Sequence, residues 1–115
     1  MYKCIIKRVI DGDTIDIDID LGFDVWLKNQ RIRLCGINTP EIRTRDTEEK
    51  EMGIESKKFV EEHFPEGSER IFISSVFERG KFGRILGDFY MPSDQYGSHT
   101  LCSILLEKKL AEPYK

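Results

Sequence analysis

The sequence predicts an α+β domain built on a five-stranded barrel with two helices. Residues 14–20 alternate strictly between isoleucine and aspartate, which is the period of a half-buried strand. Residues 46–64 place a mostly apolar set of side chains on one face at helical spacing. The predicted elements follow in the order β-β-β-α-β-β-α. Five strands with a helix between the third and the fourth are the layout of an OB-fold, a small Greek-key barrel that often binds nucleic acids.

The first three strands occupy the N-terminal third of the chain. Residues 3–10 form the first strand, and Asp11-Gly12 is a strong turn signal before the alternating strand. Residues 25–37 form the third strand, which ends at Asn38-Thr39-Pro40, because proline cannot donate to a ladder and restricts the residue before it.

A helix follows. Asp46 or Thr47 can cap it, and Glu49 stands three residues after Asp46, as in a capping box. Pro65 lies just beyond its end. The face predicted to pack on the barrel carries Met52, Ser56, Phe59, Val60, His63 and Phe64.

The last part of the chain supplies the remaining two strands and a second helix. Residues 70–77 and 84–91 are rich in β-branched and aromatic side chains. Ser98 can cap a final helix, whose apolar face would carry Leu101, Leu105 and Leu110.

Length and composition restrict the class of protein. The 115 residues have room for one domain, residues 1–115. No apolar run approaches the roughly 18 residues that span a bilayer, and no signal-peptide pattern is present. The three cysteines form no zinc-type pair. We therefore expect a cytoplasmic monomer without a membrane partner, with secretion still open if a leader has been removed.

The charges are segregated along the chain. Residues 11–24 hold six aspartates and no base, whereas residues 28–45 hold five bases against Glu41 alone. An acidic segment facing a basic one could bind a cation and an anion side by side.

Three short segments resemble those of the staphylococcal-nuclease-like (thermonuclease) family. They are residues 11–14 (DGDT), Arg33 followed by residues 38–41 (NTPE), and residues 81–84 (KFGR). Their order and spacing are similar to the family's over nearly the whole chain. The resemblance implies a Ca²⁺-dependent nuclease that hydrolyses phosphodiester bonds of DNA, RNA or both. Water would attack in line, cleave the 5′ P–O bond and leave 3′-phosphates.

The resemblance also implies roles for the catalytic residues. Arg33 and Arg84 would clamp the phosphate and stabilise the transition state, and Glu41 would position or activate the attacking water. These residue types suit that chemistry, because a guanidinium can hold two phosphate oxygens at once and a carboxylate can deprotonate water.

The same resemblance implies a calcium site made of Asp13, Asn38 and the backbone carbonyl of Thr39. Hard oxygen donors of this kind suit Ca²⁺. The family commonly has an aspartate where this chain has Asn38, so we expect weaker metal affinity here.

The substrate-binding positions show further departures. By resemblance Lys81, Phe82 and Tyr114 would contact the nucleic acid, but Phe82 stands where a tyrosine is usual and Lys109 where a glycine is expected. Asn38 is the feature that most favours an alternative function. In that alternative, the same barrel is catalytically silent and holds single-stranded nucleic acid or a protein partner.

Overall fold

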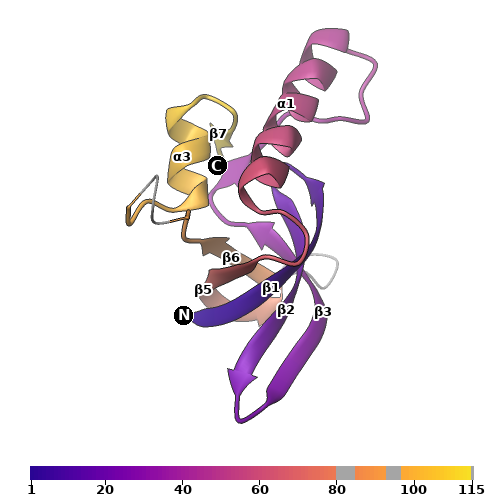
Figure 1. Cartoon of the computed structure of the whole chain (residues 1–115). Coiled ribbons are helices and arrows are strands. Elements are labelled where there is room, and N and C mark those ends of the chain that lie inside the picture. The colour runs from indigo at the N-terminus through magenta and orange to yellow at the C-terminus, as the bar shows by residue number, and fades with distance from the viewer. Residues whose placement is uncertain (80–84, 93–96, 115) are drawn as a thin grey trace.

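The described part of the chain forms a closed barrel with two helices and a small second sheet beside it (Figure 1). A computed structural model describes residues 1–79, 85–92 and 97–114, with the backbone alone for residues 75–79. The elements are β1 (Tyr2–Asp11), β2 (Thr14–Gly22), β3 (Val25–Leu34), β4 (Ile37–Asn38), α1 (Thr47–His63), β5 (Glu69–Arg79), β6 (Ile85–Phe89), α3 (Leu101–Glu107) and β7 (Glu112–Pro113).

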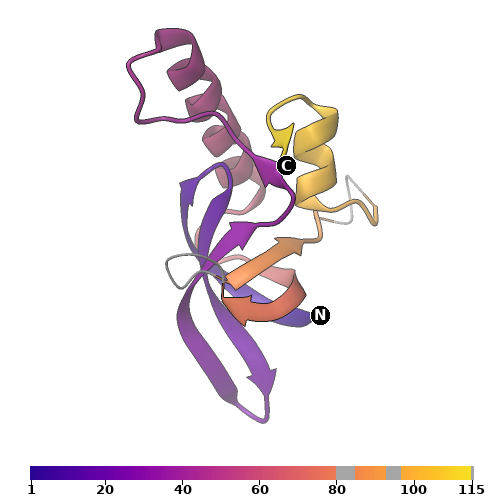
Figure 2. The same ribbon diagram turned by 180° about the vertical axis from the view of Figure 1, so that it is seen from behind.

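The barrel has the strand order β1-β2-β3-β6-β5. All its pairings are antiparallel except β3–β6, which is parallel. The predicted OB-fold is therefore confirmed. Figure 2 shows the β2–β3 hairpin extending beyond the barrel at the end opposite the two helices. Among the described residues, no helix is long and apolar enough to cross a membrane.

The alternation in the second strand has the predicted consequence. Ile15, Ile17 and Ile19 are all buried in the barrel. They belong to the same buried cluster as Phe64 and Phe89, whose rings pack edge to face with centroids 5.6 Å apart. Burial of such apolar side chains is the main force that holds this barrel closed.

Asp18 is the exception to the alternation, because its carboxylate is also buried. The backbone N–H of Asn29 donates to Asp18 Oδ1 at 2.8 Å. The ammonium groups of Lys28 and Lys7 lie 3.4 and 3.8 Å from its other oxygen. A buried carboxylate needs such partners, and here they tie β2 to both neighbouring strands.

The third predicted strand and the last predicted helix differ from the sequence prediction. The predicted strand 25–37 is interrupted after Leu34, because Gly36 takes a φ of +76° and turns the chain out of the barrel into β4. Thr100, not Ser98, caps the last helix, and its Oγ1 accepts from the Ser103 N–H at 3.3 Å. Leu110 lies beyond that helix.

The first helix begins where predicted. Asp46 is the N-cap, and its Oδ1 accepts from the N–H groups of Glu48 and Glu49 at 3.1 and 3.2 Å. Its packed face is shifted from the prediction, because Met52 is exposed and the neighbouring Gly53 is buried instead.

The Asp18 site predicts a pH-dependent contribution to stability. Burial raises the pKa of the Asp18 carboxyl, but the Asn29 N–H, Lys28 and Lys7 together outweigh it, so the pKa lies below its usual value. A lowered pKa gives stability that is present above the unfolded-state pKa of about 4 and is lost as the pH falls through the folded-state pKa. Asp18→Asn should therefore lower the unfolding free energy at pH 7 by about 1.5–3 kcal/mol, the range for a hydrogen bond to a charged group.

Urea unfolding of the wild type and of Asp18→Asn from pH 7 to pH 2 measures this difference. The gap between the two proteins should stay constant down to about pH 4 and then narrow. Asp24→Asn is the matched control, because this exposed carboxylate sits in the β2–β3 turn away from the barrel. A gap that does not change with pH would contradict the assignment.

Candidate nuclease site

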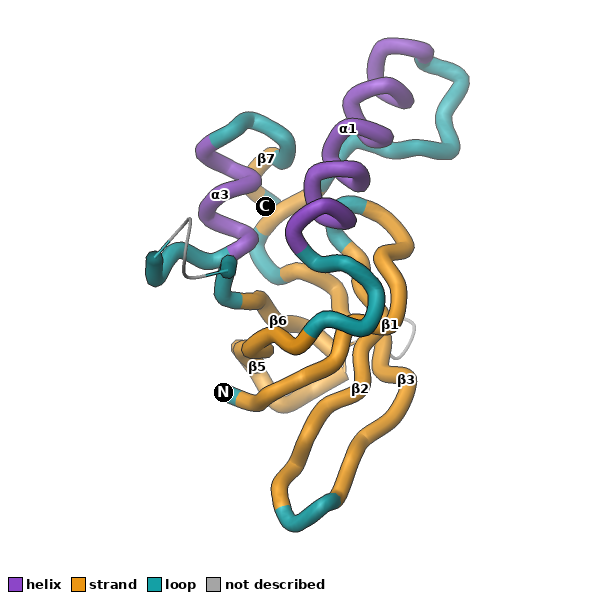
Figure 3. The backbone as a smooth tube through the Cα atoms, in the orientation of Figure 1, coloured by secondary structure: helices purple, strands orange, loops and turns teal. Residues whose placement is uncertain are grey.

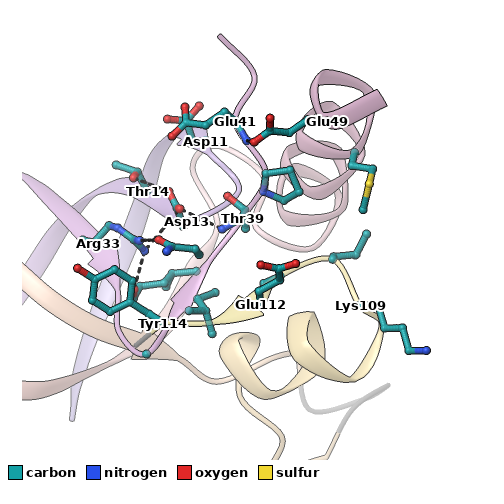
Figure 4. Close-up of a pocket in the computed structure, with 18 of the residues that line it drawn as sticks. Asp11, Asp13, Thr14, Arg33, Thr39, Glu41, Glu49, Lys109, Glu112 and Tyr114 are labelled. Carbon is teal, nitrogen blue, oxygen red and sulfur yellow. Dashed lines mark hydrogen bonds and ion pairs between the residues drawn. The ribbon is translucent and has the colours of Figure 1, made fainter. Parts of the chain in front are cut away.

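Six of the nine predicted site residues line one cavity of about 1040 Å³ (Figure 4). It lies where the β1–β2 turn, the end of β3, the β4–β7 sheet and the start of α1 come together. Asp13, Arg33, Asn38, Glu41 and Tyr114 all line it. Segments almost the whole length of the chain apart thus contribute to one concave surface, which is the usual form of a ligand site.

Arg33 lies at the centre of a bonding network at the end of β3, with a side chain only 15% exposed. Its Nη1 donates to the backbone carbonyl of Leu34 at 2.8 Å and lies 3.5 Å from Asp13 Oδ2. Its Nη2 donates to the Asn38 Oδ1. A guanidinium held on both nitrogens loses little further freedom when it binds a planar or tetrahedral anion.

Asp13 is fixed just as closely. Its Oδ1 accepts from the Thr14 hydroxyl at 3.1 Å, and its Oδ2 lies 3.3 Å from the Thr39 N–H, which donates to it. Its backbone carbonyl accepts from the Leu34 N–H at 2.8 Å. The β1–β2 turn, β3 and the segment after β4 are therefore joined through one residue.

Gly12 allows this turn to come close to its neighbours. A Cβ at position 12 would lie 2.9 Å from the Ser56 Cβ on α1 and 3.0 Å from the Thr39 Cγ2. The sequence marked Asp11-Gly12 as a turn, but the requirement at Gly12 is space, since its φ is not positive.

The loop that carries Glu41 rests on α1. Figure 3 shows it running beside the helix to the helix N-terminus. The Glu41 N–H donates to Glu49 Oε1 at 3.4 Å, so Glu49 contacts this loop instead of completing a capping box. A Cβ at Gly53 would lie 2.6 Å from the Pro40 carbonyl oxygen, so glycine is needed for this contact. The Glu41 side chain itself is exposed.

The opposite wall is the two-stranded β4–β7 sheet. Asn38 pairs with Glu112 and Ile37 with Pro113, and the Tyr114 N–H donates to the Gly36 carbonyl at 2.9 Å. Tyr114 is exposed, with 61% of its surface accessible, so its ring is available to a ligand. The Ser56 hydroxyl donates to the Leu110 carbonyl at 2.6 Å and holds this wall against α1.

Charge is distributed unevenly in the cavity. Among the described residues that line it, the bases are Arg33 and Lys109, and Figure 4 shows Lys109 directed away from Arg33. The lining carboxylates are those of Asp11, Asp13, Glu41, Asp46, Glu48, Glu49 and Glu112. The charge of the described lining residues is therefore negative, and it would oppose the binding of an anion unless a cation also bound there.

The oxygen donors of the predicted metal site suit a hard cation, and we expect them to bind it with modest affinity. Asp13 supplies a carboxylate, Asn38 an amide oxygen and Thr39 a backbone carbonyl, and all are oxygens of the kind that Ca²⁺ takes. Within residues 1–79, 85–92 and 97–114, no three His, Cys, Asp or Glu side chains gather as a metal cage. The residues fit a cation, but with one carboxylate rather than two.

The structure describes only some of the site residues that the sequence predicts. Asp13, Arg33, Asn38, Thr39, Glu41 and Tyr114 lie together. Lys81, Phe82 and Arg84 lie outside the described residues. Sequence reasoning placed Ser56 on the packed face of the helix but did not foresee its bond to Leu110, the close contact at Gly53 or the place of Glu112 in the cavity lining, because all three depend on distant segments.

Comparison with known proteins gives consistent results. A family model described as "Staphylococcal nuclease homologue" matches residues 31–115. A thermonuclease of Staphylococcus intermedius is 32% identical over 133 residues, which cover 96% of this chain and 71% of that protein. A thermonuclease of Staphylococcus hyicus is 30% identical over 112 residues, which cover 97% of this chain and 61% of that protein.

The close contact at Gly53 predicts an unusual result for Gly53→Ala. In an ordinary helix this change stabilises by about 1 kcal/mol. Here the new methyl would overlap the Pro40 carbonyl, and we expect a net loss of about 1–3 kcal/mol in unfolding free energy, as for overpacking. Chemical unfolding measures it, with the exposed Glu55→Ala as a control that should change stability by less than about 0.5 kcal/mol. A more stable Gly53→Ala protein would show that the loop does not rest on the helix.

Proposed function

This chain belongs to the staphylococcal nuclease homologue family, and we propose that it is a Ca²⁺-dependent nuclease acting on DNA, RNA or both. The observation that carries the proposal is the convergence of Asp13, Arg33, Asn38, Thr39 and Glu41 on one cavity. Both staphylococcal proteins compared above are thermonucleases, which makes a nucleic acid the expected substrate.

The acidity of the cavity supports the dependence on a cation. Phosphodiester hydrolysis develops negative charge around phosphorus, and that charge must be stabilised. With seven lining carboxylates near it, the Arg33 guanidinium alone is opposed by its surroundings. Asp13, the Asn38 Oδ1 and the Thr39 carbonyl would hold Ca²⁺, which when bound supplies positive charge to the phosphate oxygens.

The side chains divide the remaining work. Arg33 would grip two phosphate oxygens and keep the scissile group in place, because its fork is already oriented by Leu34 and Asn38. Glu41 would orient a water molecule and take its proton as the water oxygen attacks phosphorus in line. The 5′ P–O bond would break, leaving a 3′-phosphate and a 5′-hydroxyl. Arg84, by resemblance, would stabilise the same transition state.

The second candidate function is binding of nucleic acid without cleavage. It is favoured by the cation site, whose proposed donor set contains one carboxylate instead of two. Such a module would use the exposed Tyr114 ring for base stacking, as other single-strand binders do.

Cleavage of a fluorogenic oligonucleotide separates the two functions. We expect cleavage with Ca²⁺ and none with excess chelator, and faster cleavage at alkaline pH, because hydroxide is a better nucleophile than water. Glu41→Gln should keep binding and lose cleavage. Cleavage that persists in chelator would exclude the mechanism, and binding without cleavage under every condition would establish the alternative.

Arg33→Lys tests the phosphate clamp. Lysine keeps the charge but loses the planar fork, so kcat should fall by about 10²-fold, as for loss of one transition-state donor. Arg31→Lys is the matched control on the same strand, because Arg31 bonds Asp16 at 2.8 and 3.1 Å and does not line the cavity. Thermal melts should show both variants folded. Full activity in Arg33→Lys would mean that another group holds the phosphate.

A further inference from the structure

The β4–β7 sheet brings an unassigned carboxylate to the cation site. Asn38 and Glu112 are direct partners in this antiparallel pair. Residues opposite each other in such a pair project their side chains to the same face. Both residues line the cavity, and Figure 4 shows the Glu112 carboxylate pointing into it from β7.

The Glu112 carboxylate is also uncommitted. Across the described part of the chain, no hydrogen bond or ion pair engages its side chain, whereas Asp16 and Asp18 are both neutralised by bases. Its negative charge is therefore not cancelled by a close basic neighbour among those residues. A carboxylate whose charge no close base cancels attracts a nearby cation, although solvent screens part of this attraction.

The side chains around Asn38 carry little net negative charge for a cation to bind to. Asp13 is the only carboxylate in the proposed donor set, and Arg33 lies 3.5 Å from it, so the two charges largely offset each other. Asn38 is neutral, and its Oδ1 already accepts a hydrogen bond from Arg33. A divalent cation would find little net attraction from these three side chains alone.

We propose that Glu112 supplies the second negative charge of the cation site, from β7 rather than from position 38. The inference rests on the proposed function, since it concerns the same cation. Glu112 would act by holding the cation in the cavity, and its carboxylate would not take part in proton transfer. The negative charge that the family commonly carries at position 38 would thus be carried in this chain by the paired position on β7.

Calorimetric titration with Ca²⁺ tests this without any activity measurement. Glu112→Gln should weaken Ca²⁺ binding by about fivefold or more, as expected for removing one partly screened charge from near a divalent ion. Glu107→Gln removes the same charge from α3 outside the cavity and should bind as the wild type does. Asn38→Asp combined with Glu112→Gln restores the charge on the partner strand and should recover the affinity.

The outcomes separate the two proposals. Equal affinity in Glu112→Gln and the wild type, or no recovery in the double variant, would overturn the role of Glu112 and leave the proposed function standing. A wild-type protein that binds no Ca²⁺ would overturn the calcium site itself. Thermal melts without Ca²⁺ check folding, and Glu112→Asp, which keeps the charge on the same strand, should retain most of the affinity if Glu112→Gln is unstable.

Discussion

The guanidinium of Arg33 connects the barrel to the cavity, and most of the site depends on where it lies. It extends from the C-terminal end of β3, beside the hydrogen bond that the Leu34 N–H donates to the Asp13 carbonyl. It also reaches Asn38, beyond the break at Gly36. The Arg33 guanidinium therefore connects three parts of the fold: the barrel strand β3, the β1–β2 turn and the separate β4–β7 sheet. Since Arg33 is largely buried and its partners are fixed, the position of a bound phosphate would be set before it arrives.

Close backbone approach keeps that arrangement in place. Gly12 brings the turn against Thr39 and Ser56, and Gly53 brings the Pro40–Glu41 segment against α1. Ser56 in turn anchors Leu110, just before β7. The helix is therefore more than a cover for the barrel, because it holds two walls of the cavity at once. This explains why its buried positions include small residues where a helix on a barrel would ordinarily present large apolar ones.

What could be predicted from the sequence follows from how local each signal is. The alternation of residues 14–20 and the Asp46 cap depend on neighbouring residues, and both are confirmed. The division of the third predicted strand could not be foreseen, because β4 exists only by pairing with β7, about 75 residues later along the chain. The sequence indicated no role for Glu112 for the same reason. Asp13, Arg33 and Asn38 were placed together by resemblance to a family, since no local rule brings a turn and two strand ends into contact.

Two departures from the family pattern, Asn38 and Lys109, line the same cavity, whereas the third, Phe82, lies outside the described residues. Lys109 stands where a glycine is expected, and its φ of +59° is in the left-handed region that costs a non-glycine residue about 1 kcal/mol. It follows α3, whose end is closed by bonds from Lys109 to Leu106 and from Leu110 to Leu105. Glu112 lies on β7, the strand that this turn leads to, and Asn38 lies on its partner strand β4. Because Asn38 and Glu112 are exposed and lie on a two-stranded sheet apart from the closed barrel, substitutions at these two positions change the charge of the cavity outside the buried core. Under the proposed function, the barrel and the Arg33–Asp13 pair would set where a phosphate binds, while the β4–β7 wall would set how strongly a cation is held beside it.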